Sequence, residues 1–351
     1  MGVDDNLHIK YILIYLKSKK VGANMESDKR FEELYQLLLT KEDNKLKELR
    51  KKAKTQKIKE IILISITIII FICIDFPLFG NFMSIHSDDG YSLSKMVILL
   101  CILPASFIFT MILIIILSNK IIGKEDLNEK YQNDFKEKII TTMVSFFDKD
   151  LIYEKNNGID FSDYIDAEFE KYDRYLSEDL IYGKILNDRT FKMAEILTSK
   201  KNRDRDGQDY YTTIFYGIFV KAETPKPLNA SIYLRKQNSN ATIHDDLKIQ
   251  MDSSEFEKIW DIYSDNKILT MQILTADIME ILVDFKNKTN IDYEVTIKNN
   301  NIYIRFASNN VFEGDYKNSL DKKSIYEYYK IIDFTLGILK NLAKAIVEAD
   351  Y

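Results

Sequence analysis

Charged side chains gather most densely between residues 173 and 184, in the stretch DRYLSEDLIYGK. The group consists of Asp173, Arg174, Glu178, Asp179 and Lys184. Carboxylates at such short spacing could bind a divalent metal or act as an acid–base pair. Caps and salt bridges ahead of a strand account for the same residues without any chemistry. We therefore interpret the group as structural and keep a membrane-anchored enzyme with an acidic, metal-dependent site as an alternative.

The other side chains that commonly carry chemistry are few and scattered. The histidines form no triad and no metal-binding spacing; they are His8, His86 and His244. The cysteines lie inside apolar stretches and provide neither a disulfide framework nor a zinc motif; they are Cys73 and Cys101. No nucleophile and base can be paired. We predict no catalytic residue, no metal and no cofactor, and an enzyme is less expected than a binding protein.

Two apolar runs, residues 61–79 and 96–118, dominate the hydropathy pattern. Each is near the roughly twenty residues that a helix needs to cross the hydrocarbon core of a bilayer. The link between them carries Asp88, Asp89 and Lys95, whereas lysines are frequent before the first run and after the second. Because positive residues stay on the cytoplasmic side, we predict a two-helix transmembrane hairpin in a bacterial inner membrane, with both termini cytoplasmic.

Asp75 interrupts the first apolar run in the stretch FICIDFPLFG. At a rise of about 1.5 Å per residue, it lies well past the membrane midplane, where a carboxylate can reach water near the outer headgroups. Pro77, two residues later, suits a kink or the end of a helix. We interpret Asp75 as an exit signal, and the alternative is an ion- or proton-linked membrane component that uses this carboxylate.

The segments beside the hairpin read as helical stalks, one within residues 1–60 and one at 119–149. Residues 1–60 carry 15 basic and 10 acidic side chains. We expect the two stalks to pair as an antiparallel neck. A basic cluster next to the first run is expected to meet anionic lipid, where each basic residue contributes about 1 kcal/mol; it consists of Arg50, Lys51, Lys52, Lys54, Lys57 and Lys59.

From residue 150 to 351 the pattern changes to strands rich in β-branched and aromatic residues. The predicted strands are 190–200, 210–223, 229–237, 293–299 and 301–308, and helical patterns cover 276–288 and 324–349. Short loops join neighbouring strands, so the sheet should be mainly antiparallel. The fold class is α+β, with the transmembrane hairpin and its stalks followed by a sheet domain that a long C-terminal helix closes.

Several short motifs in this domain follow the order seen in one bacterial family. They are DRYLSEDLIYGKI (173–185), FKMAEI (191–196), IFYGIFVKAE (214–223), IYSDN (262–266) and ILTADIMEIL (273–282). The chain resembles the membrane proteins known only as domain of unknown function 3137 over about residues 130–345. A small-residue turn is usual where this chain has Leu176 and Ser177. The resemblance implies the fold and the membrane hairpin, and it makes a LemA-type membrane protein a conceivable partner.

The net charge also bears on function. The chain has a formal charge of -5, and residues 128–351 carry 39 acidic against 31 basic side chains. A nucleic-acid partner is therefore not expected. We predict a membrane-anchored cytoplasmic binding or scaffold module for an unidentified protein or small ligand, with the enzyme and the Asp75-linked component as alternatives. The sequence does not indicate the oligomeric state.

Overall fold

The computed structural model describes residues 29–70, 108, 112, 116, 126–185, 188–237, 243, 245–308, 311–314 and 320–349. The chain divides into two compact units. The neck unit contains Asp43–Asp134 and Gly314–Ser319. The sheet unit contains Met1–Glu42, Phe135–Glu313 and Leu320–Tyr351.

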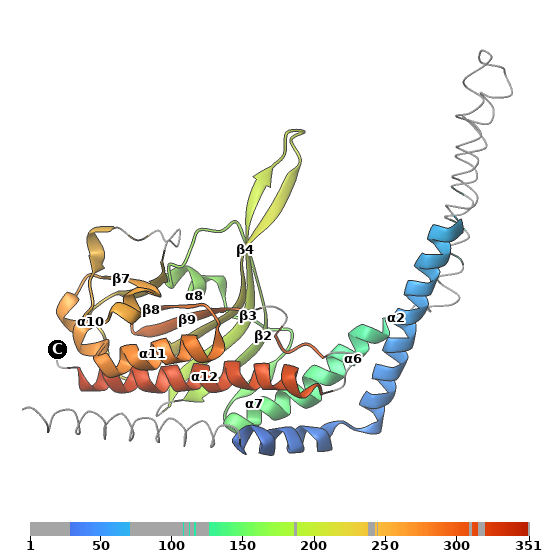
Figure 1. Cartoon of the computed structure of the whole chain (residues 1–351), viewed down its shortest axis with the longest axis horizontal. Coiled ribbons are helices and arrows are strands. Elements are labelled where there is room, and N and C mark those ends of the chain that lie inside the picture. Colours follow the sequence, from blue (N-terminus) through green and yellow to red (C-terminus); the bar gives the residue numbers. More distant parts are fainter. Residues whose placement is uncertain are drawn as a thin grey trace, which may run out of the picture. The chain divides into compact units, whose positions relative to one another are not determined.

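A nine-stranded, fully antiparallel sheet forms the centre of the sheet unit, in the order β1-β2-β3-β4-β9-β8-β5-β7-β6 (Figure 1). The predicted antiparallel α+β fold is confirmed. The strands are β1 (Ile152–Glu154), β2 (Arg174–Ile185), β3 (Arg189–Arg203), β4 (Asp209–Glu223), β5 (Ile232–Lys236), β6 (Lys248–Ile249), β7 (Trp260–Ser264), β8 (Tyr293–Lys298) and β9 (Asn301–Ala307).

Helices cover the sheet from both sides. They are the π-helix η4 (Lys136–Ile140), α7 (Thr141–Phe147), α8 (Phe161–Asp166), η5 (Asp245–Leu247), α9 (Ser254–Glu257), α10 (Lys267–Ile273), α11 (Ala276–Thr289) and α12 (Lys322–Glu348). Residues 29–41 are also helical. The predicted long C-terminal helix is confirmed as α12, which begins where the carboxylate of Asp321 accepts the N–H of Ser324 at 3.0 Å.

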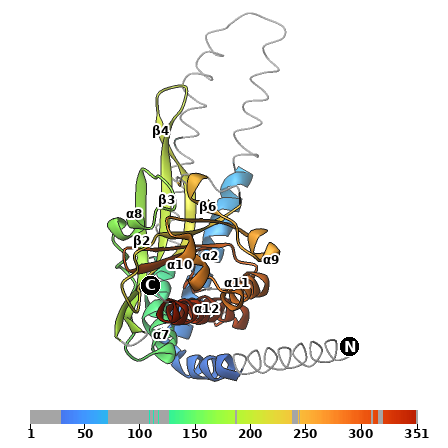
Figure 2. The same ribbon diagram turned by 90° about the vertical axis from the view of Figure 1, so that its left-hand side faces the viewer.

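The two faces of the sheet are covered differently. Figure 2 shows α8 and α12 on opposite sides of the strands. Alternation along β4 sends Phe219 to the α8 side, where it packs on Tyr164 and Tyr303, and sends the buried Ile218 and Val220 to the other side. The position directly before them is a glycine, Gly217, because a Cβ there would collide with the carbonyl oxygen of Phe306. Both faces are thus apolar at the middle of the sheet.

The hairpin formed by β3 and β4 extends beyond its neighbours (Figure 1). Pairing with β2 reaches only Ser199, and pairing with β9 begins at Gly217. Residues 200–214 therefore form a two-stranded projection, which we term the hairpin arm. Within it, Asp209 pairs with Lys201 at 2.7 Å and with Arg203 at 3.1 Å.

The neck unit contains α2 (Asn44–Ile70) and most of α6 (Leu127–Phe135). Lys45 pairs with Asp134 at 2.9 Å, and the side chain of Gln56 accepts the N–H of Leu127 at 3.1 Å. The first contact joins the start of α2 to the end of α6, and the second joins the middle of α2 to the start of α6. The two helices therefore run antiparallel.

No helix within the described ranges is both long and apolar enough to cross a membrane. The first predicted span enters the described part only as residues 61–70, the second only as residues 108, 112 and 116, and Asp75 lies outside it. The apolar end of α2 nevertheless exposes large side chains. Relative exposures of 46–60% are found for Ile61, Ile62, Ile64, Ile66, Ile68 and Ile69.

Candidate functional site

Asp179 is the member of the predicted acidic group that the fold buries. It lies in β2 where the pairing register shifts between Glu178 and Ile181, and its φ of 58° is left-handed. Asp and Asn are among the few side chains that tolerate this conformation. Its side chain is 1% exposed. The bulge therefore turns a carboxylate into the interior of the sheet unit.

Lys136 is the cation that meets Asp179. Its Nζ lies 2.8 Å from Oδ2 of Asp179 and 2.6 Å from Oε1 of Glu313. Burial would lower the pKa of Lys136, but hydrogen bonds to the two carboxylates outweigh this effect and raise it. Lys136 is the first residue of η4, and π-helical turns are frequent at functional sites.

Tyr153 supplies a second donor to Asp179. Its hydroxyl, from β1, donates a hydrogen bond to Oδ1 of the carboxylate. Burial and the charge of Asp179 both raise the pKa of Tyr153. Burial also raises the pKa of Asp179 itself, and the hydrogen bonds from Lys136 and Tyr153 offset part of that rise. Each oxygen of Asp179 thus has one donor from a different element.

Glu195 places a second buried carboxylate beside this pair. It lies on β3 directly opposite Glu178 of β2, and only 4% of the residue is exposed. Burial is the main cause that raises its pKa to about 7, and the charges of Asp179 and Glu178 add to the rise. A hydrogen bond donated by Tyr216 acts in the opposite direction and lowers the pKa. The charge pattern of the sequence does not single out Glu195. A lone carboxylate within the apolar strand FKMAEIL was the available signal.

A pocket of about 300 Å³ opens over this part of the sheet. We term it the carboxylate pocket; it is lined by Leu176, Ser177, Glu178, Glu195, Ile196, Leu197 and Tyr216. Its walls combine two carboxylates and a phenol with apolar side chains. The lining contains two glutamates and no cation, and the charge of Lys136, which also acts on Glu195, is shared with Asp179 and Glu313.

The rest of the predicted acidic group lies away from the pocket. Asp173 accepts the backbone N–H of Lys201 at 2.7 Å on the surface. Arg174 lies over the ring of Tyr211 at 5.5 Å. The structure therefore brings together Glu178 and Asp179 and separates Asp173 and Arg174 from them. Within the described ranges, no group of three or more histidine, cysteine or acidic side chains could hold a metal ion.

A second set of buried charges lies on the α8 side of the sheet. Arg305 pairs with Glu170 and Glu294, and its Nη1 lies 2.9 Å from the hydroxyl of Tyr164. Burial lowers the pKa of Arg235 to about 10, so this guanidinium stays charged at pH 7. The ring centroid of Phe169 lies 4.6 Å from the guanidinium carbon of Arg235 and 4.5 Å from that of Arg305. We term this set the arginine cluster.

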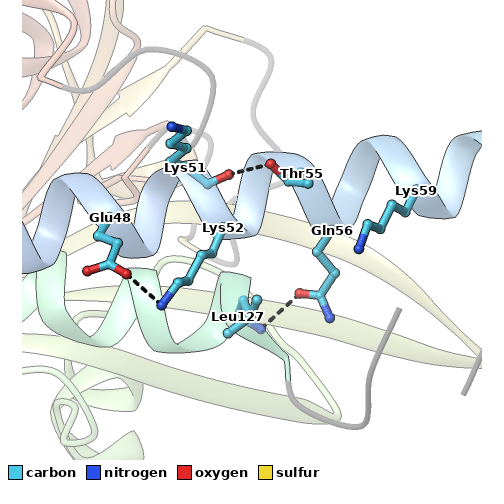
Figure 3. Close-up of a pocket in the computed structure, with 7 residues that line it drawn as sticks. All are labelled: Glu48, Lys51, Lys52, Thr55, Gln56, Lys59 and Leu127. Atoms are coloured by element: carbon cyan, nitrogen blue, oxygen red, sulfur yellow. Dashed lines mark hydrogen bonds and ion pairs between the residues drawn. The ribbon is translucent and has the colours of Figure 1, made fainter. Parts of the chain in front are cut away.

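The basic cluster predicted from the sequence lies on α2, in the neck unit. Three of its members line a groove of about 390 Å³ with Glu48, Thr55, Gln56 and Leu127 (Figure 3); they are Lys51, Lys52 and Lys59. Lys52 pairs with Glu48 at 2.7 Å. Lys57, outside the groove, pairs with Glu60 at 2.9 Å. The neck therefore presents part of the cluster on one side of the helix.

Comparisons with known proteins identify a family and no activity. Residues 213–344 match a family described as "Protein of unknown function (DUF3137)". The predicted resemblance to this family is confirmed over residues 213–344. No curated protein matches the chain significantly. A crystal structure of the mycobacterial trehalose monomycolate transport factor A is 8% identical, with a TM-score of 0.34 over 60% of this chain and 93% of that chain.

Proposed function

We propose that this protein is a membrane-anchored binding module whose carboxylate pocket takes the cationic group of a partner protein or a small ligand. The observation that carries the proposal is the buried, poorly compensated carboxylate of Glu195 beside Glu178 at an open pocket. An ammonium or guanidinium group would supply the missing positive charge. Charge-assisted hydrogen bonds of this kind are about twice as strong as neutral ones.

The shape of the pocket favours a cation on an aliphatic chain. Leu176 and Leu197 line it together with the two glutamates. Methylene groups can pack on such side chains while the charged end reaches the carboxylates, as lysine and arginine side chains do elsewhere. We therefore propose the lysine or arginine side chain of a protein, or an alkylammonium ligand, as the bound group.

Protonation of Glu195 should be linked to this binding. With a pKa of about 7, the carboxyl group is partly protonated at neutral pH. A bound cation stabilises the ionised form, lowers that pKa and releases protons. Binding should therefore strengthen as pH rises from 5.5 to 8.

Titration calorimetry on the full-length chain with agmatine and n-butylammonium tests the proposal. We expect binding about tenfold tighter at pH 8 than at pH 5.5, and proton release that changes the observed heat between buffers of different ionisation enthalpy. Glu195→Gln should abolish the pH dependence and most of the binding. Asp173→Asn, an acidic residue on the surface away from the pocket, is the matched control. Unchanged binding by Glu195→Gln would refute the proposed site.

Membrane anchoring through the predicted hairpin is the second part of the proposal. It is supported by the change along α2 from a basic surface to exposed isoleucines between Ile61 and Ile69. The lysines of the groove would then meet anionic headgroups on the cytoplasmic side. Reporter fusions at Ser87 should report the outside, and fusions at Asn128 or Tyr351 the cytoplasm. An external C-terminus would exclude this topology.

One observation favours an enzyme as the second candidate. A buried glutamate with a pKa of about 7, hydrogen-bonded to Tyr216, suits a general acid or base at neutral pH. The two functions differ in the fate of the bound ligand. A bound amine recovered unchanged supports the binding module, whereas turnover that is lost in Glu195→Gln while the ligand still binds supports the enzyme.

A further inference from the structure

We propose that the outer edge of β4 in the hairpin arm is a self-association surface, which pairs antiparallel with the same edge of a second copy of this chain. The segment concerned is residues 209–213. The pairing would be centred on Tyr211 and would join two arms into a four-stranded sheet.

The arm leaves this edge open. Residues 209–213 of β4 pair with β3 on one side, and no described strand pairs with them on the other. All five residues are exposed, with Tyr210 at 51% and Tyr211 at 49%. Isolated two-stranded hairpins are marginally stable in water, and additional strands stabilise them. An added strand would therefore stabilise the arm and satisfy its free backbone groups.

The two edges of the hairpin arm differ in how they are protected against pairing with another strand. Proteins discourage pairing at exposed edges by placing lysine, other charges or proline there. The β3 edge carries three cations, Lys200, Lys201 and Arg203, and stays positive although Lys201 and Arg203 share the single carboxylate of Asp209. The β4 edge reads DYYTT and contains neither lysine nor proline, and its single charge, Asp209, is paired within the arm. Protection is therefore confined to β3, which leaves β4 as the edge suited to pairing.

The β4 edge also matches itself. In an antiparallel pair centred on Tyr211, the two Tyr211 side chains lie opposite each other, and Tyr210 lies opposite Thr212. Aromatic pairs and aromatic–β-branched pairs are favourable across strands. Asp209 lies opposite Thr213, so no like charges face each other. A second copy of β4 therefore fits this edge without repulsion, whereas a copy of β3 would bring several like charges together.

Disulfide cross-linking of the full-length chain tests the register. In a Cys73→Ser, Cys101→Ser background, Tyr211→Cys should form a covalent dimer under mild oxidation, because opposed Cα atoms in such a pair are within disulfide range. Asn202→Cys, on the protected β3 strand of the same arm, is the matched control and should remain monomeric. Equal cross-linking at both positions would indicate random collision and overturn the proposal.

Sedimentation equilibrium provides a second, independent test. Tyr211→Lys places a like charge opposite its copy and should weaken dimerisation at least tenfold, whereas Asn202→Lys should leave it unchanged. The arm lies outside the core, so circular dichroism should show both variants folded. A wild-type chain that stays monomeric at high concentration, or a dimer unaffected by Tyr211→Lys, would refute self-pairing. Neither result bears on cation binding at the carboxylate pocket.

Discussion

The arginine cluster and the charges around the carboxylate pocket lie in different parts of the same sheet unit. Both contain buried ionisable groups, but Glu178 at the pocket is exposed. In the arginine cluster, Arg305 pairs with Glu170 and Glu294, and the ring of Phe169 contacts both Arg305 and Arg235. At the pocket, the single Lys136 pairs with Asp179 and Glu313, and Glu195 has a tyrosine hydroxyl as its donor and only the charge of Lys136 acting at longer range. One set contains matched charges, and the other has an excess of carboxylates.

The difference indicates where the molecule is built for stability and where it is built for binding. Matched buried ions are hard to disturb, because removing one partner leaves an uncompensated buried charge. A surplus carboxylate beside an open pocket is costly in the free protein, and a ligand can relieve that cost. Perturbed pKa values gather at functional sites for this reason.

The largest expected effect comes from removing one cation of each set. Arg305→Met should lower the free energy of unfolding by about 3–5 kcal/mol, because Glu170 and Glu294, whose side chains are only 11% and 8% exposed, lose the cation that they share. Lys136→Met should cost about half as much, since the side chain of Glu313, one of its two partners, is 37% exposed and can be hydrated. Urea unfolding at pH 7 measures both. Equal losses would remove the distinction between the two sets.

The pH dependence of stability should also distinguish the carboxylate pocket from the arginine cluster. The pKa of Glu195 is about 7 in the folded chain against an ordinary value of 4.5. The stability that the protonated carboxyl group contributes is therefore fully present below about pH 4.5 and is lost as pH rises through 7. Glu195→Gln should be more stable than the wild type at pH 8 by on the order of 2 kcal/mol, with no gain at pH 4. Glu294→Gln, which weakens a matched ion pair, should instead be less stable at pH 7.

A smaller effect is expected from the hydroxyl of Tyr153. Tyr153→Phe removes one donor from the buried carboxylate of Asp179, which should lower the free energy of unfolding by about 1–2 kcal/mol. The remaining partner, Lys136, keeps the site assembled. Chemical denaturation gives the magnitude. A loss comparable to that of Arg305→Met would show that the pocket side is as tightly constrained as the arginine cluster.

The smallest effect concerns the acidic residue that the sequence grouped with Asp179. Asp173→Asn changes an exposed side chain whose role is to accept one backbone N–H from Lys201. Its effect on thermal unfolding should stay within about 0.5 kcal/mol. A larger loss would mean that the two halves of the predicted acidic group act together, contrary to their separation in the structure.

The sequence predicts the elements whose patterns are regular. The strands β3, β4, β5, β8 and β9 and the helices α11 and α12 all fall on the predicted segments. The pattern did not predict β2 as a strand, because the bulge at Asp179 breaks its alternation, and it missed the short β1, β6 and β7. Local periodicity is informative only where the backbone is regular.

The candidate site is predictable only in part. Asp179 was included for its charge, but its burial depends on Lys136, 43 positions away in the chain. Glu195 reads as one polar position in an apolar strand, and only the register between β2 and β3 places it opposite Glu178. Long-range pairing of this kind leaves no local trace in the sequence, so composition could suggest acidic chemistry but could not locate it.

The π-helical turn at Lys136 has a consequence for mutation by deletion. Such a turn amounts to an α-helix that has accepted one additional residue, here within Lys136–Ile140. A three-nucleotide deletion that removes Glu137 would return this turn to ordinary α-helical hydrogen bonding and would change the direction of Lys136, the first residue of the turn. Lys136 would then turn away from Asp179 although every side chain of the site was still encoded. The number of residues in this π-helical turn therefore determines the site as well as the identity of its side chains.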